Sequence, residues 1–576
     1  MLKKIRKHYI AIILALITGI ISIAPQLYFA LSAPEYAGIQ MFAADAEHHY
    51  LARIQEVRDG HPSLGNVFLP NKDTPYLAPG LGEIITANLG RILFLDTIQF
   101  NVISKFIFPF TIFLLIYVFV YKIFASKNVA IISSALAFFG SDLTSGPSYI
   151  KELFYFTSSA VNFLPYTRPV NPQISAIFLF VSLYIIFKII RGEGGGRKNL
   201  PILLGVVSGL AIYAYVYVWS FLAVLIGLYF LYFLYSKNKE CIKKFLYVIL
   251  AHGIIAIPYW INFFQAKLHI DYADAAARQG LFESHEFVFS MWLAISLIAV
   301  LFFWPEKEYK NAKKFLLFII IALWVAINQQ IITGISLQQA HYHWFITKPL
   351  IVSIIVAALF VYSLEKIFRS KKMIILGIAV PIAILFYHAI LIQISSYKYQ
   401  YPYYIERQRY SAVISYLKGT YEDPKNIWTS SGLSWLLPAY THHNALNNNF
   451  VKYYLNNRDY LKKTLFLEYK LSGITPDNVI KVMISEKHKV SKHIFGMYYQ
   501  ENYGRYDLIP DEALEDLERE YLIFYYLDYI DIFKNLGIDL IVWDKKIDKN
   551  FEYENIPALK KSHVINDEFD IYTISY

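Results

Sequence analysis

Two carboxylates, Asp45 and Glu47, are the residues whose types and position point most directly to a reaction. They stand in the stretch Asp45-Ala-Glu-His-His-Tyr50, a few residues after the first long apolar segment. A carboxyl group in a partly dry cleft beside a bilayer has a raised pKa and can then remove a proton from a hydroxyl group. Asp45 is also a candidate helix N-cap, with Glu47 on a solvated helix face. The residues alone leave both interpretations open.

The composition predicts a membrane protein. Of the 576 residues, 56% are hydrophobic and 17% are charged, whereas soluble proteins contain about 25% charged residues. A helix of about 20 apolar residues crosses the hydrocarbon core of a bilayer, so the apolar blocks, with the longest one divided in two, predict about eleven transmembrane helices. These blocks are Ile10–Leu31, Val102–Phe124, Val129–Phe139, Ile174–Ile190, Leu200–Tyr235, Phe245–Phe264, Val288–Trp304, Phe315–Ile335, Leu350–Leu364 and Ile374–Ile394.

Basic clusters predict the orientation of these helices. Lys and Arg precede the first apolar block and then gather in every second connection, at 122–127, 188–198, 237–244, 307–314 and 366–372. Under the positive-inside rule, the N-terminus and these connections face the cytoplasm and the C-terminal residues face the exterior. We therefore expect a multi-pass protein of the cytoplasmic (plasma) membrane, surrounded by membrane lipid. The net charge of +10 comes from these connections, so it does not predict nucleic-acid binding.

Two domains are expected, a multi-span membrane domain over 1–396 and an extracytoplasmic α/β domain over 397–576. The membrane domain includes a long exterior loop at 32–96, and loops of that length are usually functional. This loop contains a predicted amphipathic helix that ends at Asp59-Gly60 and lies flat at the membrane interface. In the C-terminal domain, periodicity predicts strands at Asn426–Thr429, Gly537–Trp543 and Phe569–Ile574. It predicts helices at Glu406–Lys418 and Asp511–Lys534.

This order of features resembles the GT-C superfamily of membrane glycosyltransferases, which includes oligosaccharyltransferase catalytic subunits and protein O-mannosyltransferases. The resemblance is carried by acidic residues at the start of the long first loop, by Tyr50-Leu-Ala-Arg-Ile54 after them, and by many spans followed by a C-terminal domain. It implies a polyprenyl-phosphate-sugar donor and inverting transfer to an exterior hydroxyl group of a lipid-linked glycan, a cell-wall polymer or a protein. The resemblance makes Asp45 the general base and Glu47 the second candidate. The Trp-Trp-Asp acceptor motif of oligosaccharyltransferases is absent, which disfavours transfer to asparagine.

Transfer from a sugar phosphate requires groups that stabilise the departing phosphate. Arg168 is the first candidate, because a guanidinium group suits phosphate oxygens and this residue lies just before an apolar block. An interfacial anchor is the alternative for Arg168. The polar stretch 328–343 adjoins an apolar block, where polar residues are functional candidates or form interhelical hydrogen bonds. The other predicted substrate contacts are His341, His343, Gln338, Asn328, Arg53, His49 and Asp142.

No cofactor is predicted. His341 and His343 have no third ligand close in sequence, and Asp142 and Glu152 are ten residues apart, so a divalent metal is not favoured. Two other function classes stay open. One is a glycan polymerase or ligase that uses pyrophosphate-linked donors, and the other is a lipid-linked glycan flippase or transporter. Transporters often contain inverted repeats, and this sequence shows no internal repeat.

Overall fold

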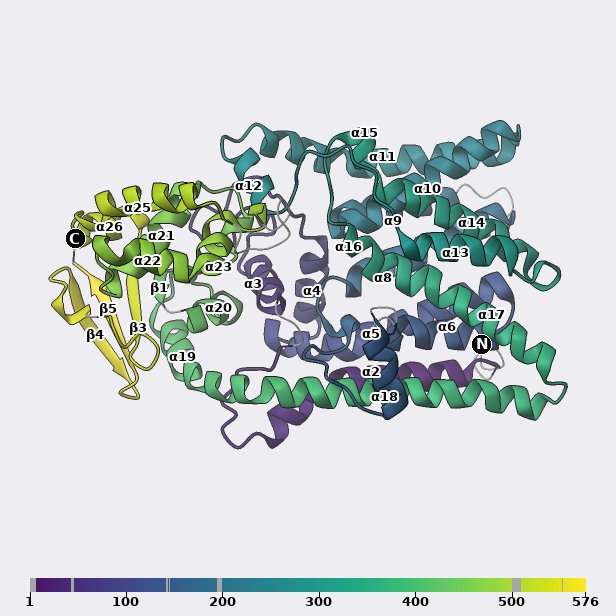
Figure 1. The fold of residues 1–576 in the computed structure, drawn as a ribbon, viewed down its shortest axis with the longest axis horizontal. Helices are drawn as coiled ribbons and strands as arrows, with labels where there is room; N and C mark the ends of the chain where they lie inside the picture. The colour runs from purple at the N-terminus through teal and green to yellow at the C-terminus, as the bar shows by residue number, and fades with distance from the viewer. Residues whose placement is uncertain are drawn as a thin grey trace.

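Long apolar helices dominate the computed structural model (Figure 1), which describes residues 7–42, 46–140, 143, 146–193, 199–429, 431–499, 509–551 and 553–575. Within these residues, eight helical segments are long and apolar enough to cross a membrane. Their main helices are α2 (Tyr9–Ser32), α5 (Thr97–Phe124), α8 (Gln173–Ile190), α10 (Val216–Tyr235), α11 (Lys239–Lys267), α14 (Glu306–Ile327), α17 (Ser353–Ile367) and α18 (Lys371–Glu406). Three shorter apolar helices accompany them, namely α6 (Lys127–Phe139), α9 (Asn199–Ala214) and α13 (Met291–Phe302).

Together these helices confirm the prediction of a polytopic membrane protein. Among the described residues, eight segments rather than about eleven have the length of a span, and the three remaining apolar helices are shorter. The longest apolar block is divided at Tyr215, which separates α9 from α10. Buried side chains of the long helices, such as Ile112, Leu183 and Leu222, pack into one large apolar core. The lengths of the apolar blocks were sufficient to predict the helices, because a backbone segment within lipid must satisfy its own hydrogen bonds.

The shorter helices are α3 (Glu47–Arg58), α4 (Leu81–Ile92), α7 (Pro147–Tyr155), η2 (Pro165–Thr167), α12 (Tyr272–Arg278), α15 (Gln330–Thr333), α16 (Gln339–Tyr342) and η3 (His343–Val352). Most of them lie between the spans, whereas α16 and η3 form the first part of the span that α17 completes. Helix α5 then begins at a capping box, in which the Asp96 carboxylate accepts from the Gln99 backbone N–H at 2.8 Å and the Gln99 side chain accepts from the Asp96 N–H. The start of α5 is thereby fixed next to α3 and α4.

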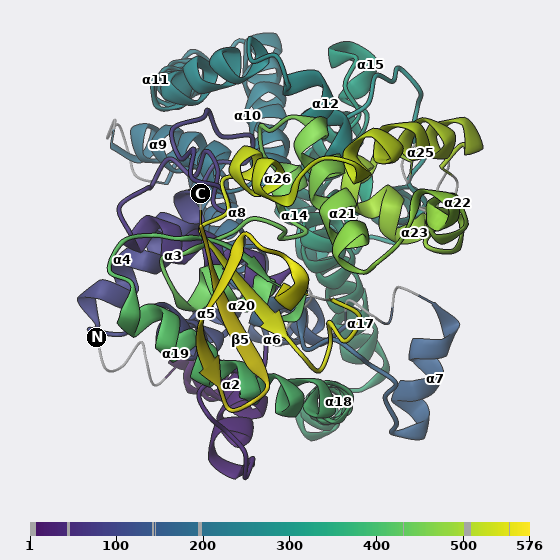
Figure 2. The same ribbon diagram turned by 90° about the vertical axis from the view of Figure 1, so that its left-hand side faces the viewer.

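The connections that carry the basic clusters lie at the end of the bundle away from the C-terminal domain, and so does the label of the N-terminus (Figure 1). This arrangement follows from helices that cross the bundle in alternating directions. Figure 2, which views the molecule from the opposite end, shows the C-terminal domain in front of the bundle. The basic connections lie at one end, as expected if every second connection is on the same side of the membrane. The assignment of this end to the cytoplasm stays a prediction.

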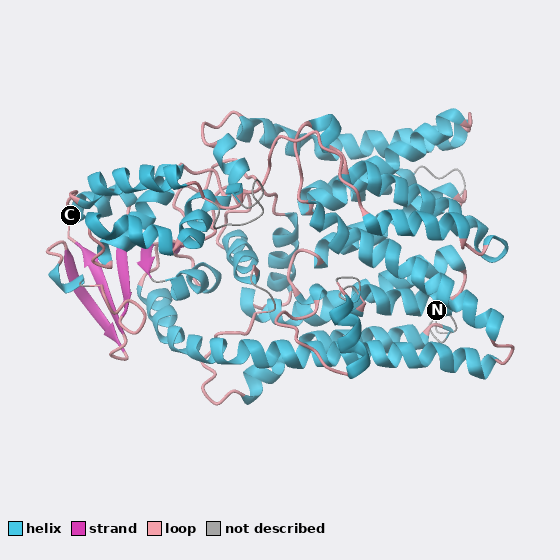
Figure 3. Ribbon diagram, in the orientation of Figure 1, coloured by secondary structure: helices cyan, strands magenta, loops and turns pink. Residues whose placement is uncertain are grey.

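The C-terminal domain contains a five-stranded sheet covered by helices, and all strands drawn in Figure 3 belong to it. The strand order is β2-β1-β3-β5-β4, with β1 parallel to β2 and β3, and β5 antiparallel to β3 and β4. The strands are β1 (Asn426–Thr429), β2 (Asn444–Ala445), β3 (Leu540–Asp544), β4 (Leu559–Ile565) and β5 (Phe569–Ile574). The helices are η4 (Arg407–Arg409), α19 (Tyr410–Thr420), α20 (Ser431–Tyr440), η5 (Val451–Tyr453), α21 (Arg458–Leu471), α22 (Pro476–Ser485), α23 (Lys487–Val490), η6 (Ser491–Phe495), α25 (Asp511–Tyr525), α26 (Tyr529–Leu536) and η7 (Tyr553–Asn555).

The predicted α/β character of this domain is confirmed, and β1 and β5 have the predicted bounds. The helix predicted over Asp511–Lys534 is two helices, because Asp528 caps a new helix by accepting from the Ile530 backbone N–H at 2.9 Å. Strand β2 has two residues and β4 is mostly exposed. Neither strand has the alternation of buried and exposed residues by which a strand is recognised in sequence.

The first long loop and the C-terminal domain share one apolar core. Phe42 contacts Tyr404 with ring centroids 5.7 Å apart. The Gln408 side chain accepts from the Ala37 and Ile39 backbone N–H groups at 2.8 and 3.2 Å and donates to the Ile39 carbonyl at 2.7 Å. The predicted boundary at residue 396 falls inside α18, a continuous helix of 36 residues. The loop at 32–96 therefore packs with the C-terminal domain as well as with the bundle.

Helix α3 is confirmed close to its predicted position, but it is not an interfacial helix. It packs between α4, α5 and α20. Its buried residues are the polar Glu47, His48, Arg53 and Glu56 and the apolar Leu51, Ala52, Ile54 and Val57. Four polar residues of α3 are therefore buried by protein, whereas His49, Gln55 and Arg58 are half-buried. This burial required contacts with α20, which is almost four hundred residues away in the chain.

Candidate active site

The start of α3 positions the residues around the predicted base. Glu47 is the first helical residue, and the N-cap position is occupied by Ala46, which makes no side-chain capping bond. The N-cap interpretation of Asp45 concerns a residue outside the described structure and stays a prediction. Asp45 itself lies outside the described residues, as does Asp142, and the roles assigned to both stay predictions.

Glu47 lies in a buried ion pair with a lysine of the membrane bundle. Its Oε1 atom accepts from the Lys105 ammonium at 2.6 Å and from the Asn101 amide at 2.5 Å, and both Glu47 and Lys105 side chains are 0% exposed. Lys105 also donates to the Thr167 carbonyl at 2.9 Å. A general base must reach the hydroxyl group that it deprotonates. The geometry favours Glu47 as an anchor that joins α3 to α5 and to the chain before α8, rather than the predicted catalytic role.

Arg168 contacts the first turn of α3 and acts electrostatically on His341. The Arg168 Nη2 donates to the Tyr50 hydroxyl at 2.9 Å, and its guanidinium carbon lies 5.1 Å from the Tyr50 ring centroid. The Tyr215 hydroxyl is hydrogen-bonded to the His341 Nδ1. Arg168 is within electrostatic range of both Tyr215 and His341. We call Tyr50, Arg168, Tyr215 and His341 the Arg168 cluster; all four are only half-buried, so a ligand can approach them.

Three other predicted contacts belong to the polar stretch 328–343. The Asn328 side chain accepts from the Val288 N–H at 2.7 Å and donates to the Val288 and Trp324 carbonyls at 3.1 and 3.0 Å. Gln338 donates to the Gln279 carbonyl at 3.2 Å. These bonds fix neighbouring segments, so the interhelical alternative describes Asn328 better than the predicted substrate contact. His343 is half-buried on η3, two residues beyond His341.

The two predicted contacts on α3, His49 and Arg53, are turned toward protein. The His49 Nε2 is hydrogen-bonded to the Tyr454 hydroxyl at 2.9 Å, and its ring stacks on Phe450 at 4.4 Å. Burial, followed by the charge of Arg53, holds the pKa of His49 well below its usual range, so this imidazole is neutral at physiological pH. The structure therefore gives His49 a packing role, and its predicted substrate contact is not supported.

Arg53 is fully engaged by its own loop. Its Nε pairs with the Glu83 carboxylate at 2.5 Å, and its Nη2 donates to the Ala78 and Pro79 carbonyls at 2.9 and 3.3 Å. Burial alone lowers the pKa of Arg53, but Glu83 and Tyr454 raise it above the usual value. The guanidinium thus holds the loop before α4 against α3, and the predicted phosphate contact is not supported.

Replacing Arg53 with Lys is expected to destabilise the protein by about 1–3 kcal/mol, because a lysine cannot reach Glu83 and the two carbonyls together. Thermal unfolding in detergent measures the loss, and limited proteolysis locates it in the loop before α4. Arg58→Lys is the matched control, because Arg58 on the same helix donates to the single Leu95 carbonyl. Equal stability of the two variants would contradict this role of Arg53.

No group of three or more His, Cys, Asp or Glu residues able to hold a metal occurs within the described part of the chain. Asp45 and Asp142 are outside that part, so metal dependence is not decided by this observation. The burial of Glu47 removes one ligand candidate of α3 from solvent.

Sequence reasoning missed several residues that surround this site. Lys105 lies within a 28-residue apolar helix, and a lysine in such a helix usually has a functional or structural role. The sequence therefore contained a signal for Lys105 that the prediction did not use. Tyr50 was noted only within the stretch Tyr50-Leu-Ala-Arg-Ile54, and Tyr215 is one of 48 tyrosines in a chain rich in them, so neither was predicted to position a charged residue. Their importance arises only from contacts with Arg168 and His341, which come from distant segments.

Comparison with known proteins identifies the fold. No protein-family model matches this chain, and no curated protein sequence matches it. The oligosaccharyltransferase of Archaeoglobus fulgidus tethered with an acceptor peptide is similar in structure, with a TM-score of 0.50 and 12% identity over 99% of this chain and 74% of that chain. Its apo form gives a TM-score of 0.48 with 11% identity, covering 94% of this chain and 70% of that one. ArnT from Cupriavidus metallidurans bound to undecaprenyl phosphate gives 0.46 with 10% identity, covering 77% and 86%.

At these identities the similarity is one of fold. The multi-span bundle, the long loop after the first span and the C-terminal domain all fall within the aligned region, since nearly the whole chain is covered. The architecture inferred from sequence is thereby confirmed: the chain shares its overall fold with the Archaeoglobus fulgidus oligosaccharyltransferase.

Proposed function

We propose that this protein is a glycosyltransferase that moves a sugar, with inversion, from a polyprenyl-phosphate-linked donor to a hydroxyl group of an extracytoplasmic acceptor. The acceptor is a lipid-linked glycan, a cell-wall polymer or a protein. Asp45 is the general base, and Arg168 with His341 binds the donor phosphate. One observation carries the proposal: the Arg168 cluster lies beside the first turn of α3, which begins two residues after Asp45.

In the proposed reaction, Asp45 removes the proton and Arg168 stabilises the leaving phosphate. The acceptor oxygen attacks the anomeric carbon while the bond from that carbon to the phosphate oxygen breaks, and the phosphate leaves with the electron pair. Asp45 takes the hydroxyl proton, because a neutral hydroxyl is a poor nucleophile. The Arg168 guanidinium stabilises the charge on the departing phosphate through hydrogen bonds. Tyr50 and Tyr215 hold Arg168 and His341 in place.

The orientation and the fold support this assignment. The basic connections lie at the opposite end of the bundle from α3 (Figure 1), whose residue Tyr50 contacts Arg168, so we place the N-terminus in the cytoplasm and the reaction at the exterior face of the cytoplasmic membrane. Similarity to the fold of an oligosaccharyltransferase supports a glycosyl transfer. The proposed step uses no cofactor, and half-buried cations beside a bilayer suit a donor whose lipid stays in the membrane.

Arg168→Gln is expected to slow transfer by about 10- to 100-fold, because one charge-assisted hydrogen bond to phosphate is worth about 1.5–3 kcal/mol. Mass spectrometry of lipid extracts tests this in cells with the wild-type protein, the variant or no protein. A polyprenyl-phosphate-linked monosaccharide should accumulate without the protein and, to a smaller extent, with Arg168→Gln. Arg168→Lys should fall between them, since lysine keeps the charge and loses the planar fork.

Arg191→Gln is the control, because Arg191 lies in a basic connection at the far end of the bundle and should leave the lipid profile unchanged. Accumulation of pyrophosphate-linked oligosaccharides instead would favour the polymerase or ligase class. An unchanged profile in cells without the protein would overturn the proposed function and direct attention to transport.

A further inference from the structure

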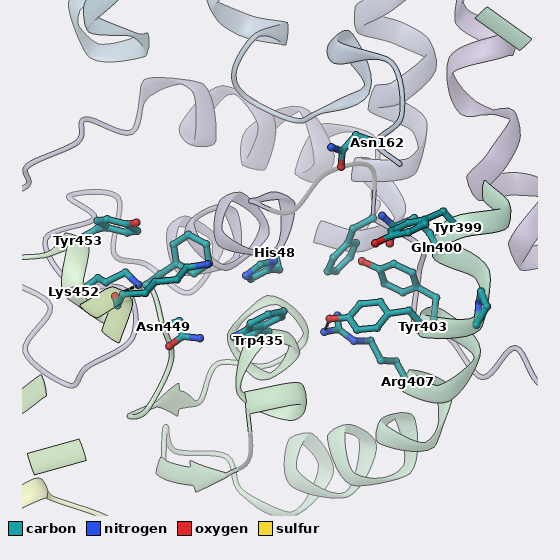
Figure 4. A pocket seen from close by; sticks show the side chains of 15 residues that line it. His48, Asn162, Tyr399, Gln400, Tyr403, Arg407, Trp435, Asn449, Lys452 and Tyr453 are labelled. Atoms are coloured by element: carbon teal, nitrogen blue, oxygen red, sulfur yellow. Dashed lines mark hydrogen bonds between the residues drawn. The ribbon is translucent and has the colours of Figure 1, made fainter. Parts of the chain in front are cut away.

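A cavity of about 480 Å³ lies where the start of α3 meets the end of α18, helix α20 and the η5 segment (Figure 4). The described residues that line it include three cationic side chains, Arg407, Lys452 and Lys492, and no carboxylate. Phe42 and His48, which flank Asp45 in the sequence, line it as well. The cavity is therefore cationic, and it is lined by residues on both sequence sides of the proposed base.

Arg407 is a buried cation without a carboxylate. It is 5% exposed, and within the part of the chain that the structure describes it forms no ion pair. Its Nη2 donates to the Tyr403 hydroxyl, and its guanidinium carbon lies 3.8 Å from the Tyr403 ring centroid and 5.4 Å from that of Trp435. Other buried arginines have acidic partners, such as Glu83 for Arg53 and Asp274 for Arg278. A buried charge without a counter-ion is costly, so Arg407 is suited to a partner that the fold does not supply.

Lys452, on the other side of the cavity, is also a buried cation without a carboxylate partner among the described residues. It is 2% exposed, donates to the Lys492 carbonyl at 2.6 Å and forms no ion pair among the described residues. Burial, with the charges of Lys492 and Arg278, lowers its pKa to about 7. In Figure 4, Arg407 and Lys452 lie on opposite sides of the pair formed by His48 and Trp435. An anionic ligand in the cavity would be within reach of cations from both sides.

His48 and Trp435 offer hydrogen-bonding groups between these cations. Their rings stack at 5.0 Å with an interplanar angle of 9°. The His48 Nε2 and Trp435 Nε1 are buried and have no hydrogen-bond partner in the described structure. Burial and then Arg407 lower the pKa of His48 to about 3, so the imidazole is neutral. Orphaned polar atoms in a cavity are satisfied when a ligand supplies oxygen atoms.

The cavity is distinct from the Arg168 cluster. His48 and Tyr50 are two positions apart on α3, and at about 100° per residue they point to nearly opposite sides of the helix. Tyr50 contacts Arg168, whereas His48 lines the cavity. The first turn of α3 thus separates two cationic sites, and Asp45 precedes that turn. Most of the cavity lining comes from the end of α18 and from the C-terminal domain, away from the membrane spans.

We propose that this cavity binds the acceptor, and that the acceptor is an acidic glycan whose carboxylate, phosphate or sulfate group lies between Arg407 and Lys452. The assignment to the acceptor rests on the proposed function, because the Arg168 cluster is there assigned to the donor phosphate. A guanidinium and an ammonium on either side of a buried site select an anion over a neutral sugar. Asp45 lies between Phe42 and His48 in the sequence, and both of these residues line the cavity.

Binding is tested on the full-length protein in detergent by thermal unfolding with soluble probes. The probes are tri-galacturonic acid, the neutral trisaccharide maltotriose, inorganic pyrophosphate and undecaprenyl phosphate. A ligand that binds only the folded protein raises the unfolding temperature. We expect the acidic trisaccharide to raise it and the neutral one not to. In Arg407→Gln the affinity for the acidic probe should fall at least tenfold, and Arg519→Gln, on exposed α25, is the control for the change of charge.

Two further readouts separate ligand binding from a structural role. Without ligand, Arg407→Gln should unfold at the same or a higher temperature, because it removes an uncompensated buried charge, whereas a structural arginine would lower it. Binding should also weaken as pH rises through about 7, since Lys452 is charged below that pH. The groups that face Lys452 are Lys492, Arg278, the neutral His493 and Tyr453. Lys452→Gln should therefore flatten this pH dependence.

Equal shifts in wild type and Arg407→Gln, or no shift with the acidic trisaccharide, would overturn the proposal. An Arg407-dependent shift with pyrophosphate or undecaprenyl phosphate alone would assign the cavity to the donor head group and overturn the acceptor assignment. The assay requires no turnover, so Asp45→Asn should bind the acidic probe like wild type. The acidic probe could bind through Arg407 while cells without the protein accumulate no lipid-linked sugar. That result would support the anion site and overturn the proposed function.

Discussion

Asp45→Asn is expected to reduce sugar transfer by about 10²- to 10⁴-fold, the usual contribution of a general base. The amide keeps the size of the side chain and cannot accept the hydroxyl proton. Because Glu47 is held by Lys105 and Asn101, it is not free to replace the missing carboxylate. The effect should appear in the rate at saturating donor more than in donor affinity, since the donor phosphate is assigned to Arg168.

The donor for this measurement comes from cells that lack the protein, whose lipid extract should contain the accumulated sugar carrier. Its consumption is followed by mass spectrometry in membranes that carry wild type, Asp45→Asn or Asp45→Glu at equal protein levels. Asp45→Glu retains a carboxylate one methylene further away and should recover part of the rate. A wild-type rate in Asp45→Asn, with the donor consumed normally, would remove Asp45 from the reaction.

Lys105→Met should destabilise the protein by about 3–5 kcal/mol, because it leaves the Glu47 carboxylate buried without its cation. The pair has no solvent exposure on either side, so water cannot replace the lost partner. Thermal unfolding in detergent, at one scan rate for all variants, measures the effect. Lys122→Met is the control, because Lys122 on the same helix forms a half-exposed pair with Glu193 and should change stability by less than about 1 kcal/mol.

A double variant separates the structural role of Glu47 from a catalytic one. Glu47→Leu with Lys105→Met removes both charges and replaces them with apolar groups of similar volume, which is often close to neutral for stability. We expect the double variant to unfold near the wild-type temperature and to keep most of its transfer activity. A stable but inactive double variant would instead make Glu47 the base.

The membrane part of the fold was predictable from local sequence. Blocks such as Val102–Phe124 and Ile174–Ile190 predicted α5 and α8 to within a few residues at most of their ends. In lipid, a chain must satisfy its backbone hydrogen bonds within one segment, so length and hydrophobicity alone specify a helix. The strands β1 and β5 were also predicted with correct bounds, because their residues have strong strand preference.

The candidate site was predictable in part. Arg168 and His341 were chosen separately, for charge and for position at the edge of an apolar block, and the structure brings them together through Tyr50 and Tyr215. Asn328, Arg53 and His49 were chosen by the same reasoning, and their side chains form hydrogen bonds with other groups of the protein. A polar residue near a membrane has the same appearance in sequence whether it binds a ligand or a neighbouring carbonyl.

Local sequence is sufficient to predict the spans, the basic connections and the position of the acidic stretch. Each of these depends only on the residues of one segment and on the solvent around them. The partner of Glu47, the burial of α3 and the cavity beside Arg407 depend on contacts between residues from about 60 to about 400 positions apart. Such contacts form only when the first long loop and the C-terminal domain close around one core. They decide which carboxylate is anchored and which cations are left for a ligand.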